Sequence, residues 1–217
     1  MLKIRLKLRN MVTIATCLAV ITIFLSCKKD DKEPNTSLTY DEGIVINGVK
    51  WATRNVDKPG TFAVTSENAG MFYQWNRKTA WPATDKISGW NSSTPTSSAW
   101  ERDNDPSPSG WRIPTFTELQ KLCDTDNVTF EWIDKDGFIG GKFTDKSTGN
   151  SLFLSAAGCR LADDGTLYDA GSYGYYWSST AYDTDNDYIL LFDNCCAGLY
   201  WCGSCRNEGK SIRSVAE

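Results

Sequence analysis

Apolar residues recur at helical spacing in one segment of this chain, near the middle of its sequence. Leu119, Leu122 and Cys123 would share one face of a helix there. Thr115 and Glu118 have the spacing of a capping box, in which each residue satisfies a backbone amide of the other. Because this is the one convincing helix signal, the sequence predicts a fold dominated by strands and irregular backbone.

Short strands bounded by turn residues account for most of the remaining order. Asn47-Gly48, the strongest short hairpin signal, lies between Ile44–Ile46 and Val49–Trp51. A second hairpin is expected around the polar turn Asp145–Asn150. We therefore predict one α+β domain over residues 43–217, with short antiparallel strands, one well-signalled helix and long irregular loops. Further strands are expected at Phe72–Trp75, Phe138–Phe143, Leu152–Leu154, Tyr175–Trp177, Tyr188–Phe192 and Ser211–Arg213.

The N-terminus has the pattern of an export signal. Residues 1–10 are basic, and residues 11–26 contain no charged side chain. A run of this length is short for a membrane-spanning helix, which needs about 20 apolar residues, and is typical of a secretory signal peptide. The run ends in a small residue followed by Cys27, which resembles a bacterial lipobox. We predict a lipoprotein signal peptide over residues 1–26 and lipidation of Cys27, with an uncleaved N-terminal anchor as the alternative.

The residues from Cys27 to position 42 are mostly polar and lack an apolar period, which predicts a disordered tether. Their charged stretch resembles the export tag that carries Bacteroidota lipoproteins to the outer face of the outer membrane, and it equally suits a solvated linker. The expected location is therefore the cell surface, with a lipid anchor in the outer membrane.

Composition removes several function classes. The chain contains no histidine, which excludes Ser-His-Asp triads, Cys-His pairs, His-ligated zinc and imidazole proton shuttles. It carries 23 Lys and Arg against 27 Asp and Glu, and the first 26 residues hold four of the cations and no acid. The rest of the chain is markedly acidic, so it has no electrostatic footprint for nucleic acid or for an anionic membrane surface.

The tryptophans raise the question of a ligand. Between Arg77 and Gly110 lies a long polar stretch that contains several of the nine tryptophans. Flat aromatic rings suit stacking on sugar rings, so Trp81, Trp90 and Trp201, which lie in polar or cysteine-rich loops, are candidates for an exposed ligand-binding platform. The alternative is that each ring pins its loop to the body of the domain.

Six cysteines lie beyond Cys27, and four of them fall within eleven residues near the C-terminus. In an exported protein an even number favours disulfides, and six cysteines allow 15 pairings. Four close thiolates also suit a thiophilic metal such as zinc or Cu(I), and a Cys-x-x-Cys pair suits redox chemistry. The disulfide candidates are Cys123, Cys159, Cys195, Cys196, Cys202 and Cys205.

Asp183, Asp185 and Asp187 place oxygen ligands at alternate positions, as calcium loops do. Backbone carbonyls and a remote carboxylate such as Asp193 would have to complete the shell. The segment lacks the glycine and the glutamate of an EF-hand, and a charged turn between two strands is the alternative interpretation. No other cofactor is expected.

Three ordered motifs, at residues 104–115, 153–160 and 174–180, resemble the Fibrobacter succinogenes major paralogous domain, and residues 50–56 and 211–215 fit the two ends of that pattern. The resemblance covers nearly all of the predicted domain. The family looks related to the C-type-lectin-like and formylglycine-generating-enzyme-like folds, in which an Arg-aliphatic-Pro-Thr segment also enters a helix. The resemblance implies a C-type-lectin-like fold and a surface location, and little about activity.

Export, tethering and aromatic loops favour a non-catalytic cell-surface lipoprotein module for binding or adhesion, with a glycan or a surface protein as its partner. The alternative is a formylglycine-generating-type enzyme, in which a C-terminal cysteine pair binds copper, or a thiol oxidoreductase. A structural component of surface appendages is a third interpretation.

Overall fold

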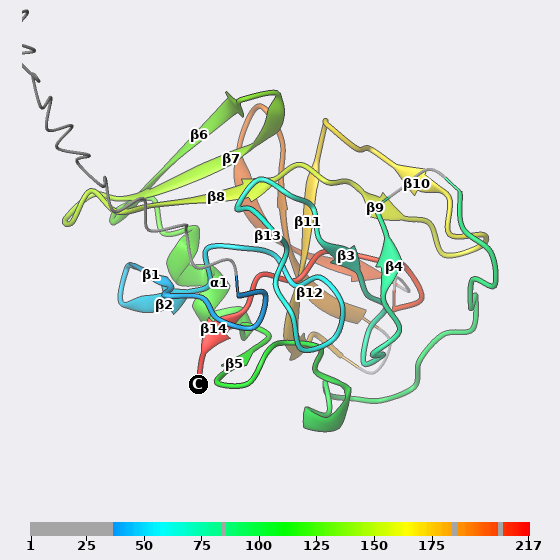
Figure 1. Ribbon diagram of the computed structural model, residues 1–217. Coiled ribbons are helices and arrows are strands. Elements are labelled where there is room, and N and C mark those ends of the chain that lie inside the picture. Colours follow the sequence, from blue (N-terminus) through cyan, green and yellow to red (C-terminus); the bar gives the residue numbers. More distant parts are fainter. Residues whose placement is uncertain (1–36, 84–85, 184–185, 204–205) are drawn as a thin grey trace, which may run out of the picture. The chain divides into compact units, whose positions relative to one another are not determined.

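The described part of the chain contains three short antiparallel sheets, two small strand pairs and one α-helix (Figure 1). The structure is a computed structural model that describes residues 37–83, 86–183, 186–203 and 206–217, and the side chains of residues 201–203 are not described. The sheets have the orders β1-β2-β14-β5, β6-β7-β8 and β11-β12-β13, and β3 pairs with β4 and β9 with β10. The elements are β1 (Ile44–Ile46), β2 (Val49–Trp51), β3 (Met71–Phe72), β4 (Trp81–Pro82), a 3-10 turn (Arg102–Asn104), β5 (Trp111–Arg112), α1 (Phe116–Leu122), β6 (Val128–Lys135), β7 (Phe138–Asp145), β8 (Ser151–Ser155), β9 (Cys159–Arg160), β10 (Leu167–Tyr168), β11 (Gly174–Ala181), β12 (Asn186–Phe192), β13 (Ala197–Gly203) and β14 (Val215–Ala216).

The coarse sequence prediction of short antiparallel strands with one helix is confirmed. Asn47 and Gly48 adopt φ angles of 46° and 75°, which closes the β1–β2 hairpin in the expected register. The backbone N–H of Asn47 donates to Asp145 Oδ2 over 2.7 Å, so the first hairpin is bonded to the end of β7.

Helix α1 begins where the capping box predicts. Thr115 Oγ1 accepts from the backbone N–H of Glu118, and Glu118 Oε2 accepts from the backbone N–H of Thr115 over 2.8 Å. Leu119 and Leu122 are buried, and Arg112 binds the same glutamate through two hydrogen bonds of 2.6 and 2.8 Å. This ion pair ties β5 to the first turn of the helix.

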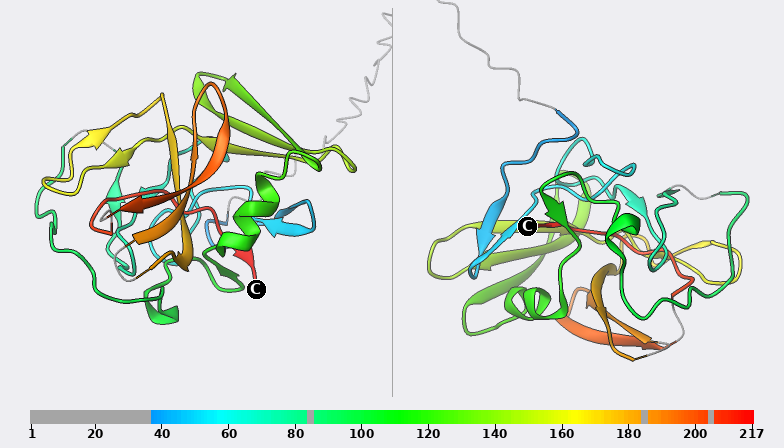
Figure 2. Two further views of the ribbon diagram at one scale, coloured as in Figure 1. Left: turned by 180° about the vertical axis from the view of Figure 1, so that it is seen from behind. Right: turned by 90° about the horizontal axis from the view of Figure 1, so that it is seen from below.

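The last strand joins the two ends of the domain. Val215 of β14 pairs with Trp51 of β2 and with Arg112 of β5. Figures 1 and 2 show the red C-terminal strand beside the blue N-terminal hairpin. Strand β14 therefore links the N-terminal hairpin to β5.

Two predicted strands need correction. The Phe72–Trp75 strand ends at Phe72, and Ser211–Arg213 forms no strand. Instead, the C-terminal segment bonds to a different element at each residue, because Tyr73 N–H donates to Lys210 O, Trp177 N–H to Ser211 O and Val56 N–H to Ile212 O. Because successive residues bond to different partners, the segment forms isolated β-bridges and does not form the continuous hydrogen-bond ladder of a strand.

The same C-terminal segment carries cations into the interior. Lys210 is fully buried, and its amine lies 4.2 Å from the ring centroid of Trp177 and 2.6 Å from Glu208 Oε2. Arg213 is held by Asn55 Oδ1 at 2.9 Å and by the carbonyl of Ala52 at 3.2 Å. Burial lowers the pKa of Arg213 to about 10, so the guanidinium stays charged at neutral pH.

Two main apolar clusters fill the domain. One joins α1 to β6–β8 and β12 through Leu119, Phe143 and Phe192, and the other surrounds Trp75 and Trp177. Among the described residues no helix is long and apolar enough to cross a membrane. The predicted signal peptide of residues 1–26, the lipidation site Cys27 and most of the tether lie outside the described residues and stay predictions.

Candidate functional site

A polar cleft of about 300 Å³ lies where three segments meet: strand β6, the loop before β11, and the turn between β12 and β13. Figure 1 shows the orange β12–β13 turn beside the green β6–β7 hairpin at this point. The cleft is lined by Trp132, Gly171, Ser172, Tyr173, Asp193 and Asn194.

Trp132 reaches the cleft because of the alternation along β6. Val128, Phe130 and Trp132 share the face of the strand that turns toward the core, and the burial of Val128 marks that face. The Trp132 ring packs edge-on against Phe192, with ring centroids 6.2 Å apart and an interplanar angle of 65°. Trp132 is only half-buried, so the ring is supported on one side and accessible on the other.

Tyr173 is held by a tight turn. The backbone N–H groups of Ser172 and Tyr173 both donate to the carbonyl of Asp169 over 3.0 Å, and Gly171 adopts a φ of 79° that suits glycine. The Tyr173 ring lies against Tyr175, at a centroid distance of 6.0 Å. The second aromatic wall of the cleft is therefore preorganised by its own loop.

The hydroxyl of Tyr175 also holds the loop before β11, because it donates a hydrogen bond to Asp169 Oδ2 over 2.7 Å. Burial, together with the hydrogen bond and the charge of Asp169, raises the pKa of Tyr175 well above its usual value. The phenol stays protonated and remains a donor across the accessible pH range.

Asp193 supplies a carboxylate at the rim. Its Oδ1 accepts from the backbone N–H groups of Cys195 and Cys196 over 2.8 and 3.1 Å, which fixes the carboxylate in the turn. Its Oδ2 has no hydrogen-bond or ion-pair partner among the described residues. One oxygen is therefore structural, and the other is available to a ligand.

Three further lining groups have unused hydrogen-bonding capacity within the described part of the chain: the hydroxyls of Ser172 and Tyr173 and the side-chain amide nitrogen of Asn194. Polar groups that converge beside aromatic rings are the usual composition of a small-molecule site. The arrangement can donate hydrogen bonds to, and accept them from, one ligand that contacts Trp132 and Tyr173.

Trp81 and Trp90, two members of the aromatic platform predicted from the sequence, do not line this cleft. Trp81 is 9% exposed, so the expectation that it presents an open face is wrong. Its ring lies 4.9 Å from that of the half-buried Trp90 at 55°, and Trp90 Nε1–H donates to the carbonyl of Ala162 over 2.9 Å. These two rings pin their loops to the domain, which is the alternative that the sequence left open. The side chain of Trp201 is not described, and its backbone pairs with Tyr188.

Trp81 also borders a wide groove of about 530 Å³. Among the described residues that line it, Lys86 and Ser88 are the ones with a polar side chain other than the indole. The groove is larger than the cleft at Trp132 but offers fewer converging polar groups, so it is the weaker candidate.

The cysteine cluster of the sequence is divided in space. Cys195 and Cys196 lie in the β12–β13 turn, whereas the backbone of Cys202 pairs with Asp187 at the far end of β13. At about 3.3 Å per residue, the strand places the Cα atoms of Cys196 and Cys202 about 20 Å apart. A disulfide needs Cα atoms within about 7 Å, so neither a bond between these two nor a single four-thiolate metal site fits this register.

The described thiols are free in the structure: Cys123, Cys159, Cys195 and Cys196. Burial raises the pKa of Cys123 to about 12 and that of Cys159 to about 11, so both stay as unreactive thiols at neutral pH. Cys195 and Cys196 are exposed beside the cleft. Cys205 lies outside the described residues, and the disulfide network stays a prediction.

Asp187, one of the three predicted calcium ligands, is already occupied by another partner. Asp187 is buried, and both of its carboxylate oxygens bind Arg206. Asp183 accepts two hydrogen bonds from the side chain of Asn186, and Asp185 lies outside the described residues. Within the described part of the chain, no three acidic or cysteine side chains are grouped as a metal site.

Comparisons of the chain with family models, with curated proteins and with solved structures find no match. Membership of the family suggested by the motifs therefore stays a prediction.

Proposed function

We propose that this chain is a carbohydrate-binding module of the cell surface and that the cleft at Trp132 and Tyr173 is its sugar site. The observation that carries the proposal is the combination of two aromatic rings with three polar side chains of unused hydrogen-bonding capacity, on Ser172, Asp193 and Asn194. The apolar faces of sugar rings pack on aromatic side chains, and their hydroxyls pair with converging donors and acceptors.

The size of the cleft limits what enters it. About 300 Å³ is at the low end for ligand pockets, so the cleft suits one sugar unit and not an extended chain. Single-unit sites of this kind bind weakly. Many copies tethered to one surface gain avidity because each further contact becomes intramolecular, and this suits a role in adhesion.

The proposal includes a lectin-like fold and a lipid anchor at Cys27 that holds the module on the outer membrane. The fold is supported by the Arg112–Thr115 segment, which leads directly into α1 in the manner that the family resemblance implies. The anchor is supported by the uncharged run before Cys27 and the charged tether after it.

The test is a binding screen of the purified protein against single sugars and short glycans, followed by titration of Trp132→Ala and Tyr173→Ala. The matched control is Tyr168→Ala, which removes an exposed tyrosine (53% exposed) outside the cleft. We expect both cleft variants to weaken binding by about tenfold or more, as loss of an aromatic stacking contact does, and the control to bind normally. The unfolding midpoint of each variant shows whether the fold is intact.

Two results would contradict the proposal. Unchanged binding by folded Trp132→Ala and Tyr173→Ala would remove the sugar site from this cleft. Binding of no sugar in the screen, with capture of a surface protein through the same residues, would replace a glycan partner by a protein partner.

A further inference from the structure

We infer that the sugar bound in this cleft carries a positive charge, so that the preferred ligand is an amino sugar with a free amine. The inference rests on the proposed sugar site and specifies its ligand class. It follows from the charges that surround the two aromatic rings.

The cleft contains a carboxylate that no cation neutralises. Neither lysine nor arginine is among its lining residues, and Asp193 has no ion-pair partner in the described part of the chain. Two backbone N–H groups hold Asp193 Oδ1, while Oδ2 is left with its full acceptor capacity. A carboxylate held in this way binds an ammonium donor more strongly than it binds a neutral hydroxyl, because charge-assisted hydrogen bonds are about twice as strong as neutral ones.

The nearest lysines along the sheet are directed to its other face. Residues one or three positions away from Trp132 on β6 point away from it, and this opposite face carries Glu131 and Lys135. Lys135 binds Glu67 and Ser66, and Lys142 of β7 binds Glu131 over 3.0 Å. Both amines are engaged there and do not offset the charge of the cleft.

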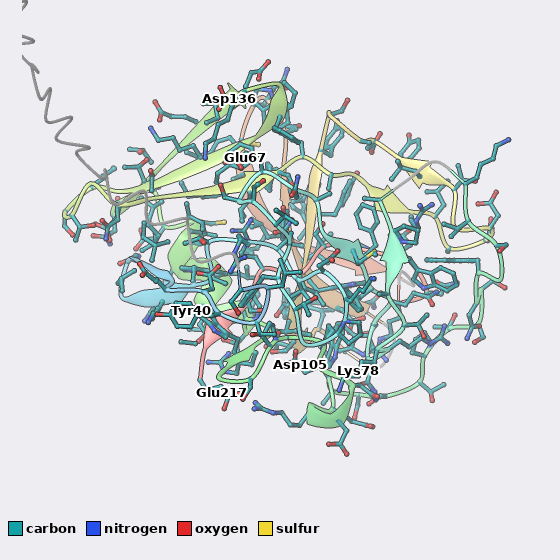
Figure 3. The ribbon with its side chains drawn as sticks, in the orientation of Figure 1. Tyr40, Glu67, Lys78, Asp105, Asp136 and Glu217 are labelled. Carbon is teal, nitrogen blue, oxygen red and sulfur yellow. The ribbon has the colours of Figure 1, made fainter. Side chains whose placement is uncertain are left out.

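The surrounding carboxylates add to the negative potential. Asp136 occupies the tip of the β6–β7 hairpin, where Figure 3 labels it. Asp169 supports the loop that carries Tyr173. An ammonium group near Trp132 and Tyr173 would also gain cation–π attraction, which an acetylated amine or a carboxylated sugar cannot.

The probes are glucosamine, N-acetylglucosamine, glucose and glucuronate, titrated into the full protein at low and at high salt. We expect glucosamine to bind about tenfold more tightly than glucose at low salt, the preference to shrink at high salt, and glucuronate to bind most weakly. The decisive variant is Asp193→Asn, because asparagine keeps a carbonyl oxygen for the two backbone N–H groups and removes the charge. The control is Asp134→Asn, which neutralises an exposed carboxylate outside the lining.

The inference is supported if Asp193→Asn loses the preference for glucosamine over glucose while Asp134→Asn largely keeps it. It is overturned if N-acetylglucosamine or glucose binds as well as glucosamine in a manner that depends on Trp132, an outcome that leaves the proposed function standing. If none of the four sugars nor any glycan binds, both proposals fail. Should Asp193→Asn not fold, the ranking of the four probes and its salt dependence on the unmodified protein decide the question.

Discussion

Arg206 and Asp187 form a doubly hydrogen-bonded ion pair in the interior, with Nε–Oδ2 and Nη2–Oδ1 distances of 2.9 and 3.0 Å and both side chains 1% exposed. The same guanidinium donates to the carbonyl of Ser97 over 2.8 Å and lies 5.4 Å from the ring centroid of Trp75. One side chain therefore ties the C-terminal segment to β12 and to the long polar loop.

Asp187→Asn should strongly destabilise the fold, because it leaves a buried guanidinium without a counter-charge. We expect the free energy of unfolding to fall by about 3 kcal/mol, measured by urea denaturation. The control is Arg102→Gln, which breaks the exposed pair of Arg102 with Glu217 and should cost about 0.5 kcal/mol or less. Equal effects of the two variants would show that the interior pair contributes no more than a surface pair.

The stability of the domain should depend on pH through Glu67. Burial alone would raise its pKa, but hydrogen bonds from Lys135, Ser66 and Thr65 outweigh burial and lower it from 4.5 to about 2. A carboxyl group whose pKa is lower in the folded state contributes stability above its unfolded pKa. That contribution is lost as the pH falls from about 4.5 toward 2.

Glu67→Gln should therefore lower stability at neutral pH by about 1 kcal/mol, a figure reduced for solvent screening because Lys135 is 42% exposed. The variant should also flatten the curve of stability against pH between about 4.5 and 2. Urea denaturation at a series of pH values measures both effects. The control is Glu131→Gln, which removes a more exposed carboxylate from the sheet face that carries Lys135. An equal change in the curve of this variant would contradict the assignment to Glu67.

The sequence predicted those elements whose formation depends on a few neighbouring residues. Asn47-Gly48 closes its hairpin, and Thr115 with Glu118 starts the helix, because both signals act on the local backbone. Strand β13 is different, since Ala197–Gly203 contains two glycines and a cysteine and becomes a strand by pairing with β12. β6 is absent from the predicted strands although Val128, Phe130 and Trp132 alternate with polar residues in the way that signals a half-buried strand.

The candidate site was not predictable from sequence motifs. Trp132, Tyr173 and Asp193 belong to three segments that only the tertiary fold brings together. Conversely, the compact Cys-Cys-x5-Cys-x2-Cys pattern looks like one site in sequence, yet an extended strand separates Cys196 from Cys202. Proximity in sequence indicates proximity in space only where the backbone turns, and here it is extended.

The thiols should separate into two reactivity classes. Cys195 and Cys196 are exposed and should be alkylated in the native protein, whereas Cys123 and Cys159 should react only after unfolding, because burial hides the thiols and raises their pKa. Mass spectrometry of peptides after iodoacetamide treatment, with and without denaturant, distinguishes the four sites. Resistance of Cys195 and Cys196 until a reductant is added would show that they are disulfide-bonded and would favour the six-cysteine network predicted from the sequence.

Trp90 should stabilise its loop and leave sugar binding unaffected. Its ring contacts Trp81, its indole N–H bonds to Ala162, and a Cβ atom at Gly165 would lie 2.6 Å from the ring, which shows how closely the two segments pack. Trp90→Ala should lower the free energy of unfolding by about 2–3 kcal/mol, less than a fully buried tryptophan would because the ring is half-buried. Limited proteolysis should then cut the polar loop sooner, since its contact with residues 162–165 is lost.

Trp132→Ala, in contrast, should impair sugar binding more than it lowers the free energy of unfolding. The opposite result would be a Trp90→Ala variant that keeps normal stability but no longer binds sugar. That result would assign sugar binding to Trp90 and place the sugar site in the groove beside Trp81.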